Sequence, residues 1–308
     1  MIEKLLKEAQ NQAAALHLAA GQSPLLVQPG HTQAMAQPKL TREEFARLLE
    51  AVRDWGMIQE GEAEVGVPGV GRCLVRSRPG WLSLEPLPSE LPASLEDLNL
   101  PQILADLMSL PQGLVLLGGQ RQCGLSTTLA CLLEILLRHG SSRRVLLCGN
   151  HPTVHSHGKG LLIQSGHLEV GYHFDVVVTP LPADPRLCIQ LAENGCLVIA
   201  TMRAPHTPNM VDQLQSLLPP LWTPRLQQSL KALYCQRLVR ADELLLPVSE
   251  FVHGELAQKW LSAPGPREYP KCLEKQKGCW SLLHSLQDWV DQEKITAEQA
   301  EPILQTWS

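Results

Sequence analysis

The sequence predicts an α/β protein built from two domains, and three observations lead to that prediction. The chain has 308 residues, about the length of two ordinary domains. Its second half contains short, nearly continuous apolar runs separated by helical patterns, as in a parallel sheet covered on both faces. Residues 61–88 instead alternate in polarity and are broken by Gly and Pro, as in antiparallel strands joined by turns.

The first half predicts a small α+β domain. An amphipathic pattern covers residues 3–20, which we expect to be helical into the segment ALHLAA, and residues 21–30 then form a short extended piece. Residues 41–55 predict a helix that begins at Thr41, because Glu44 three positions later completes a capping box. We expect this domain to span residues 1–97, followed by a Pro-broken linker at 98–110.

The second domain, residues 111–308, predicts alternating strands and helices. Helices are expected at 126–140 and in the C-terminal part, at 212–220, 226–239, 255–262, 281–292 and 296–307. Buried strands are expected from the apolar runs at 113–119, 145–149, 174–179 and 196–201.

Composition excludes several classes of function. The net charge of −5 gives no general attraction to nucleic acid or to anionic lipid. The apolar runs are far shorter than the roughly 18–20 residues that cross a bilayer, so no direct membrane insertion is expected. Nine scattered cysteines, an odd number, favour free thiols in a reducing compartment over a disulfide framework. We therefore expect a cytoplasmic protein.

Residues 118–128, GGQRQCGLSTT, carry the most specific signal in the chain. Gly119, Gly124 and Ser126 match the spacing of the phosphate-binding loop G-x-x-x-x-G-K-[ST], but Leu125 stands where that loop has lysine. The segment lies directly between a predicted strand and a predicted helix, as a phosphate loop requires. An ordinary strand–helix turn is the alternative interpretation of this segment.

Beyond the loop, the chain resembles the PilT-type retraction ATPases of type IV pili, in the secretion ATPase superfamily. The resemblance covers nearly the whole chain and implies an N-terminal PAS-like α+β domain, then a RecA-like P-loop NTPase domain with C-terminal helices. A short deletion near residues 166–174 is expected to remove much of one helix. The matching segments are ALHLAAGQSPLL (15–26), VPGVGRCLVR (67–76), LPQGLVLLGGQRQCGLSTTLACLL (110–133), FDVVVT (174–179), LAENGCLVIATMRAP (191–205) and KGCWSLLHSL (277–286).

Carried over position by position, the resemblance implies that the catalytic groups are lost. The loop lysine falls on Leu125, and the catalytic glutamate after the second strand falls on Leu181. Asp175 and Asp184 are retained around the reshaped segment with Pro180 and Pro182. The acidic pair of the family falls on Asn150 and His151, before Pro152, and its two histidines fall on Cys196 and Arg203.

Hydrolysis needs charge stabilisation at the phosphoryl group, a bound magnesium ion and an oriented water. The resemblance therefore implies a pseudo-ATPase with no catalytic residue and no protein metal site. At most, weak binding of ATP or ADP with Mg²⁺ is expected, with Arg121 and Arg203 as replacement cations. The expected cofactor-binding residues are Gly119, Gly124, Leu125, Ser126 and Thr127.

Three hypotheses about function stay open on the sequence alone. The chain is a non-catalytic partner of the type IV pilus machinery for twitching motility, an atypical active ATPase, or an adaptor outside pili. Under the first, the resemblance implies a hexamer-like ring of its own, mixed assembly with a paralogous PilT-type ATPase, or contact with the inner-membrane platform protein at the pilus base. Outside the loop, His151, His155 and His157 have spacing compatible with a metal, although a solvated loop explains them more simply.

Overall fold

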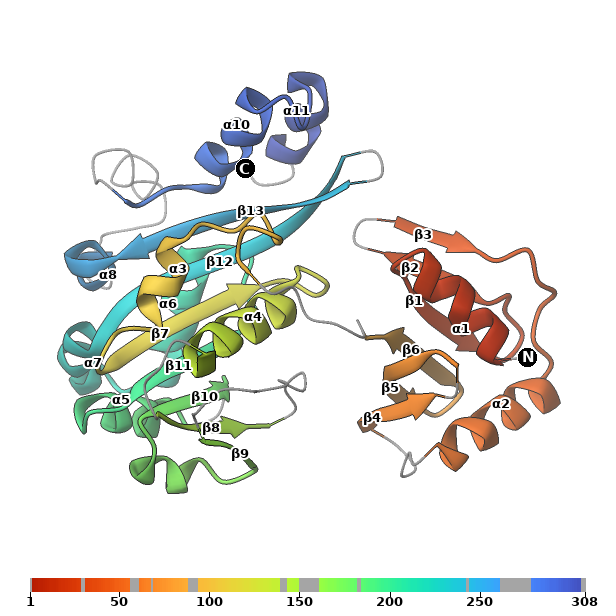
Figure 1. The fold of residues 1–308 in the computed structure, drawn as a ribbon, viewed down its shortest axis with the longest axis horizontal. Coiled ribbons are helices and arrows are strands. Elements are labelled where there is room, and N and C mark those ends of the chain that lie inside the picture. The colour runs from red at the N-terminus through yellow and green to blue at the C-terminus, as the bar shows by residue number, and fades with distance from the viewer. Residues whose placement is uncertain are drawn as a thin grey trace. The chain divides into compact units, whose positions relative to one another are not determined.

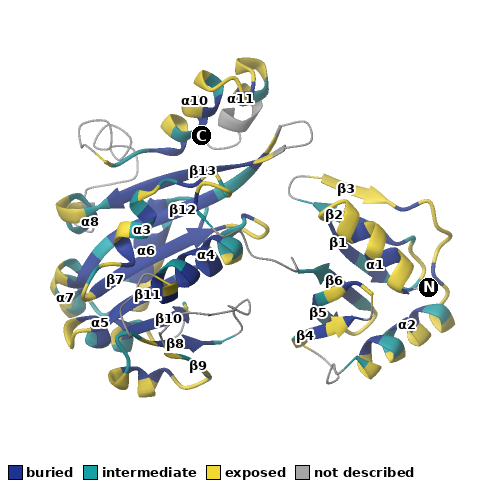
Figure 2. Cartoon of the chain, viewed as in Figure 1, coloured by how far each residue is buried: buried dark blue, intermediate teal, exposed yellow. Residues whose placement is uncertain are grey.

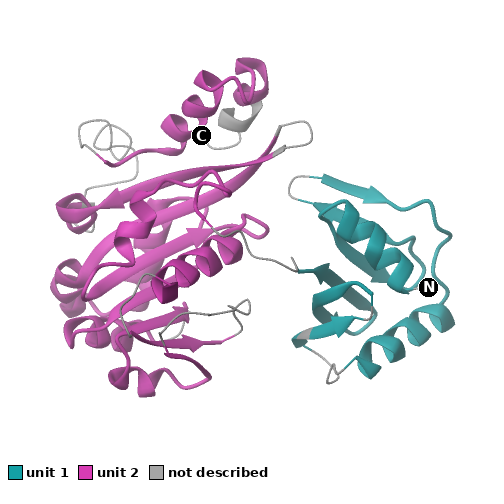
Figure 3. Cartoon of the chain, in the orientation of Figure 1, with its two compact units in different colours: residues 1–91 teal, residues 92–308 magenta. Residues whose placement is uncertain are grey.

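The structure is a computed structural model of the whole chain, and it describes residues 2–28, 31–55, 61–67, 69–87, 94–138, 143–149, 161–181, 184–241, 244–260 and 278–305. The chain folds into two compact units, Met1–Leu91 and Pro92–Ser308 (Figure 3). Each contains one sheet and its own buried core, so the predicted mixed α/β class is confirmed. No helix among the described residues is both long enough and apolar enough to cross a membrane.

The first unit is an antiparallel sheet packed against two helices (Figure 1). The predicted helix with its capping box is confirmed: the Thr41 hydroxyl accepts from the Glu44 amide, and Glu44 accepts from the Thr41 amide. The strands lie in the order β3-β2-β1-β6-β5-β4. The bounds are α1 Ile2–Asn11, β1 Ala15–Ala19, β2 Leu25–Gln28, β3 His31–Ala34, α2 Arg42–Asp54, β4 Gly61–Val67, β5 Gly71–Arg78 and β6 Trp81–Pro86.

One prediction for this unit is wrong, because the first helix does not continue into ALHLAA. It ends at Asn11, and Ala13 takes a left-handed conformation with φ of 47° that a helix does not allow. The next residues form β1, which is hydrogen-bonded between β2 and β6. Tertiary pairing therefore overrides the apolar pattern that favoured a longer helix.

The second unit contains a seven-stranded sheet in the order β13-β12-β7-β11-β10-β8-β9, in which only the β12–β13 pair is antiparallel. The predicted strands at 113–119, 145–149, 174–179 and 196–201 are confirmed. The strand bounds are β7 Gly113–Gly119, β8 Arg144–Cys148, β9 Leu161–Ser165, β10 Val176–Pro180, β11 Leu197–Met202, β12 Leu230–Ala241 and β13 Leu244–His253.

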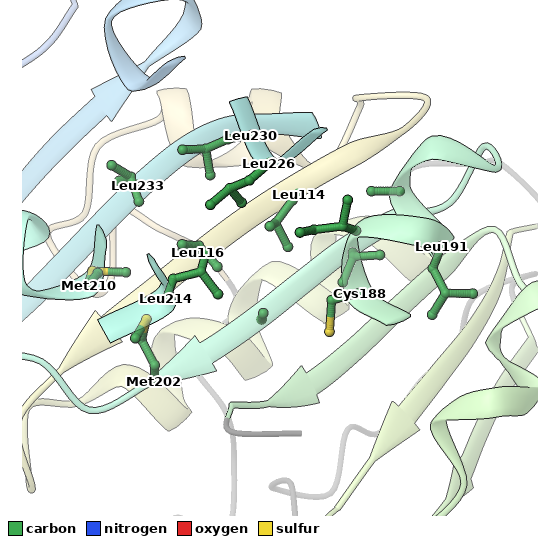
Figure 4. Packing of buried hydrophobic residues seen from close by; sticks show 14 of the residues in the cluster. Leu114, Leu116, Cys188, Leu191, Met202, Met210, Leu214, Leu226, Leu230 and Leu233 are labelled. Carbon is green, nitrogen blue, oxygen red and sulfur yellow. The ribbon is translucent and has the colours of Figure 1, made fainter. Parts of the chain in front are cut away.

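Helices cover both faces of this sheet. Figure 2 shows its central strands mostly in dark blue, the colour of buried residues. On one face, leucines of β7 and β12 pack against Met210 of α6 and Cys188 of α5 (Figure 4). The opposite face packs on α3 and α4. The helix bounds are α3 Ile103–Leu107, α4 Leu125–Arg138, η1 Leu168–His173, α5 Pro185–Glu193, α6 Thr207–Leu217, η2 Pro220–Trp222, α7 Thr223–Ser229, α8 Gly254–Trp260, α10 Leu282–Asp291 and α11 Ala297–Gln305.

The helix predicted over 226–239 is wrong. Helix α7 ends at Ser229, and the chain continues as the long strand β12, which pairs with β7 on one side and β13 on the other. Residues of β12 enter the cores on both faces of the sheet: Leu233 lies in one and Tyr234 in the other. A strand buried on both faces has no alternating pattern, so its apolar run resembles a helical one.

The segment expected to be a linker packs into the second unit. Leu100, Leu104 and Leu107 of this segment, and Leu95 just before it, are buried in the core cluster that also contains residues of β7 and α4. The leucines between the proline breaks therefore contribute to this core, which the proline pattern alone does not indicate.

Asp175, directly before β10, ties the amino ends of two neighbouring strands together. Its carboxylate accepts from the Arg144 backbone amide at 2.7 Å and from the guanidinium at 2.9 Å. The Arg144 side chain lowers the pKa of Asp175 by hydrogen bonding. A carboxyl group whose pKa is lower in the folded state stabilises that state above the ordinary Asp pKa, and this stabilisation is lost as pH falls through the lowered value.

We therefore predict that Asp175→Asn destabilises the second unit at pH 7 and that the difference disappears in acid. The loss should be about 0.5–1 kcal/mol, because both side chains are more than one-third exposed to solvent. Urea unfolding of both proteins from pH 7 down to about pH 3 measures it. Asp212→Asn, at an exposed position on α6, is the control. A difference that stays constant over this range would contradict the assigned role of the ion pair.

Candidate functional site: the glycine loop

The turn between β7 and α4 lies at the carboxyl edge of the parallel strands, where ligands bind in sheets of this kind (Figure 1). Residues Gln120, Arg121 and Gln122 at its tip are exposed, whereas Cys123 is buried beneath it. Burial raises the pKa of the Cys123 thiol, and the nearby amides of Leu125 and Cys123 oppose that rise. The tip of the loop is therefore solvated, whereas the end next to α4 is buried and carries a neutral thiol.

The two glycines of the loop are required by close packing. A Cβ on Gly119 would lie 2.3 Å from the Cys123 sulfur and 2.7 Å from the Gln236 carbonyl oxygen. Gly124 has φ of +78°, and a Cβ there would approach the Gln236 side-chain nitrogen to 3.0 Å. The glycine spacing thus has a structural reason in this chain whether or not a phosphate binds.

Gln236 of β12 holds the base of the loop. Its side-chain amide donates to the Cys123 carbonyl at 2.8 Å. Its side-chain oxygen accepts from the hydroxyls of Thr128 and Tyr234, each at 2.8 Å. Gln236 is only 2% exposed, so these bonds form where water does not compete, and burial also raises the pKa of Tyr234.

Leu125 packs toward the interior. It is the first residue of α4, is half-buried, and contacts the core cluster beneath that helix. The lysine position of the motif is therefore occupied by Leu125, an apolar side chain that packs against the core. Ser126 remains exposed and Thr127 half-exposed at the start of the helix, so the helix N-terminus itself stays accessible to an anion.

The described acidic positions that the resemblance singled out do not supply a catalytic carboxylate. Asp175 precedes β10 and so lies at the opposite edge of the sheet from the loop. Asp184 caps α5, accepting from the amides of Arg186 and Leu187 at 2.9 and 3.3 Å. Leu181, at the expected glutamate position, packs against the core and donates its amide to the Thr201 carbonyl.

The positions of the family's two histidines are separated by the fold. Cys196 lies buried directly before β11, where its thiol donates to the Phe174 carbonyl at 3.1 Å. Arg203 is exposed just beyond the other end of β11, on the same sheet edge as the loop. The expected replacement cations Arg121 and Arg203 are thus both exposed on that edge.

Asn150, His151, His155, His157 and Pro182 lie outside the described residues. Within the described part of the chain, no three His, Cys, Asp or Glu side chains are placed to hold a metal ion.

Sequence reasoning missed a polar cluster beside the loop. The loop and the segment after β11 are joined by the Ala204 amide, which donates to the Gly119 carbonyl at 3.3 Å. Next to this contact, Arg237 donates to the Pro205 carbonyl and meets His206 at 2.9 Å. The other nitrogen of His206 lies 3.1 Å from Glu250, which accepts from the Thr207 amide and hydroxyl.

This cluster fixes the start of α6 and leaves no unpaired carboxylate of its own beside the loop. Glu250 is buried, and its two carboxylate oxygens contact Thr207 and His206. The signal that could have revealed it is the polar pair Gln236-Arg237 inside an apolar run, which is unusual for a helix buried on one face.

We predict that Gln236→Leu destabilises the second unit by about 2–3 kcal/mol. The substitution removes three buried hydrogen bonds, those of Gln236 with the Cys123 carbonyl and with the Thr128 and Tyr234 hydroxyls. Urea unfolding measures the loss, and hydrogen exchange at the Gly124 and Leu125 amides should become faster. Gln228→Leu, at an exposed site on α7, is the control and should change stability by no more than about 0.5 kcal/mol. Equal stability of the two variants would show that Gln236 does not hold the loop.

The sequence and fold of the chain were compared with those of known proteins. No family model matches the chain. The type IV pilus retraction ATPase PilT of Pseudomonas aeruginosa is 25% identical over 269 residues, covering 77% of each protein. Among solved structures, the ATPase DotB of Legionella pneumophila has a TM-score of 0.78 at 16% identity, over 99% of this chain and 95% of its own.

The pilus retraction motor PilT, solved with bound ADP, has a TM-score of 0.72 at 21% identity, over 97% of this chain and 95% of its own. At these identities the two structures establish the fold, and the sequence match to the Pseudomonas protein adds the relationship. In sequence and fold, the chain is PilT-like: it is similar to the type IV pilus retraction ATPase PilT.

Proposed function

We propose that this protein is a pseudo-ATPase that acts as a regulatory or structural partner of the type IV pilus machinery. The observation that carries the proposal is the fate of the positions where the motor chemistry should lie. Leu125 and Leu181 pack against the core, and the Asp184 carboxylate caps the start of α5. The fold is retained, while apolar side chains occupy the positions of the loop lysine and of the catalytic glutamate in the described part of the site.

In this proposal nucleotide binds weakly and is not hydrolysed. The loop backbone and the start of α4 supply amide donors, and Ser126 supplies an exposed hydroxyl at the position where the motif holds Mg²⁺. Gly119, Gly124, Leu125, Ser126 and Thr127 would line ATP or ADP, with Arg121 and Arg203 as the nearest candidate cations. Bound Mg²⁺ would neutralise the developing charge on the phosphates, but Leu181 stands at the position of the glutamate that would activate the water.

The same proposal assigns the protein to assembly. It acts on the cytoplasmic side of the pilus base, as a ring of its own or within the ring of an active PilT-type ATPase, where it contacts the inner-membrane platform protein. Two features support this role: the described parts of both units keep complete cores, and the relationship to PilT extends over most of the chain. The alternative is an atypical, weakly active pilus motor, which would need groups that the described site does not present.

Leu125→Lys separates lost binding from lost catalysis. A lysine at this half-buried position can lay its stem along the core and direct its ammonium toward bound phosphates. We expect ATP affinity, measured by calorimetry, to rise about tenfold with no detectable turnover, because Leu181 still replaces the glutamate.

Leu125→Met, which keeps the apolar contact without the charge, is the matched control and should leave affinity unchanged. Turnover gained by Leu125→Lys alone would favour the atypical motor, since it would show that the other catalytic groups are present.

The partner role predicts an effect on an active motor. Adding this chain to a PilT-type ATPase from the same organism should change ATP turnover in a dose-dependent way and produce a mixed oligomer by light scattering. Substoichiometric amounts should suffice if one inactive subunit affects a whole ring. If the rate and the mass distribution of the motor both stay unchanged at excess, the proposal fails and an adaptor function outside this motor replaces it.

A further inference from the structure

A second concave site lies in the second unit, apart from the glycine loop. It is a cleft of about 480 Å³ bounded by the turn at 94–100, by β13 and by α10. None of its lining residues belongs to the loop or to α4. Nothing in the proposed ATPase-like role uses this cleft, so its chemistry can be considered independently.

Two indole rings form rigid walls of the cleft. Trp280 is fixed by paired backbone hydrogen bonds to Phe251, at 2.9 and 3.0 Å, and by its indole nitrogen donating to Ser249 at 3.2 Å. Trp289 is 7% exposed and donates its indole nitrogen to the Pro247 carbonyl at 2.8 Å. Because both indole N–H groups are already paired, the rings offer a ligand aromatic surface, most of it from the half-buried Trp280, since Trp289 belongs to a core cluster.

Oxygen-bearing side chains complete the lining, and two of them are carboxylates. Glu96 comes from the turn before α3 and Asp288 comes from α10, so the negative charges are contributed by two separate elements. The amides of Asn99 and Gln292 also line the cleft. Among the ion pairs of the described residues, none involves Glu96 or Asp288.

A ligand for this cleft must therefore combine positive charge with a flat or apolar body. A hydrated metal ion fits poorly, because indole walls offer it no ligand and only two carboxylates are present. A guanidinium group fits both features, since it stacks on aromatic faces and donates paired hydrogen bonds to carboxylate oxygens. Tryptophan and arginine are also the residues that most often anchor protein interfaces.

We propose that this cleft is a docking site for an arginine side chain on a partner protein. The guanidinium would lie against Trp280 or Trp289 and donate hydrogen bonds to Glu96 and Asp288. The two tryptophans are held in place before binding by their hydrogen bonds to Phe251, Ser249 and Pro247, so the aromatic part of the site needs little ordering.

The test uses Nα-acetyl-arginine amide as the probe and the full chain labelled at its tryptophan indoles. In NMR titrations we expect the indole signals of Trp280 and Trp289 to shift with a millimolar dissociation constant, whereas those of Trp55 and Trp81 in the first unit stay in place. Trp280→Phe and Trp289→Phe assign the two signals. The citrulline analogue, equal in shape but uncharged, should produce no comparable shift.

Carboxylate variants then decide the charge contribution. Glu96→Gln and Asp288→Asn should each weaken the probe about threefold, and the double variant about tenfold, while added salt should weaken binding to the wild type. Glu298→Gln, an exposed carboxylate on α11 that does not line the cleft, is the matched control. Equal shifts with citrulline, unshifted Trp280 and Trp289 signals, or undiminished binding by a folded double variant would each overturn the proposal.

Discussion

One buried side-chain amide, that of Gln236, connects strand β12 to the glycine loop between β7 and α4. It bridges the Cys123 carbonyl to the hydroxyls of Thr128 and Tyr234, so β12, the loop and α4 are held as one piece. The glycines follow from it, because Gly119 and Gly124 must let the loop approach β12 closely. The shape of a phosphate loop is thus maintained here by the core, independently of any nucleotide.

This constraint holds the loop in place without a contribution from the other motif positions. The positions to which the resemblance assigns motor chemistry are occupied here by packed or paired side chains. Leu125 and Leu181 join the cores on opposite faces of the sheet, and Asp175 pairs with Arg144 at the far edge. The core around the loop is therefore packed without a lysine at position 125 or a glutamate at position 181. The cluster of Arg237, His206 and Glu250 likewise forms hydrogen bonds that hold the start of α6.

The sequence allowed the α/β class, the capped helix at Thr41 and the strand–loop–helix context of the glycines to be predicted, because each rests on a local pattern. It failed where burial on both faces removes periodicity. Strand β12 has apolar residues facing both cores, and β13 carries Pro247, which an edge strand tolerates but which discourages a strand prediction. Since Gln236, Arg237 and Glu250 all lie on these two strands, the elements that support the loop could not be predicted.

In the function we propose, this chain differs from an active motor in that it does not hydrolyse ATP. Its most direct test is ATP turnover by the purified protein at millimolar ATP with Mg²⁺, with oligomer size read by light scattering in the same samples. We expect no turnover above background, whether or not nucleotide binds. Turnover well above background that Ser126→Ala abolishes would contradict it, because the activity would then belong to this loop and not to a contaminant.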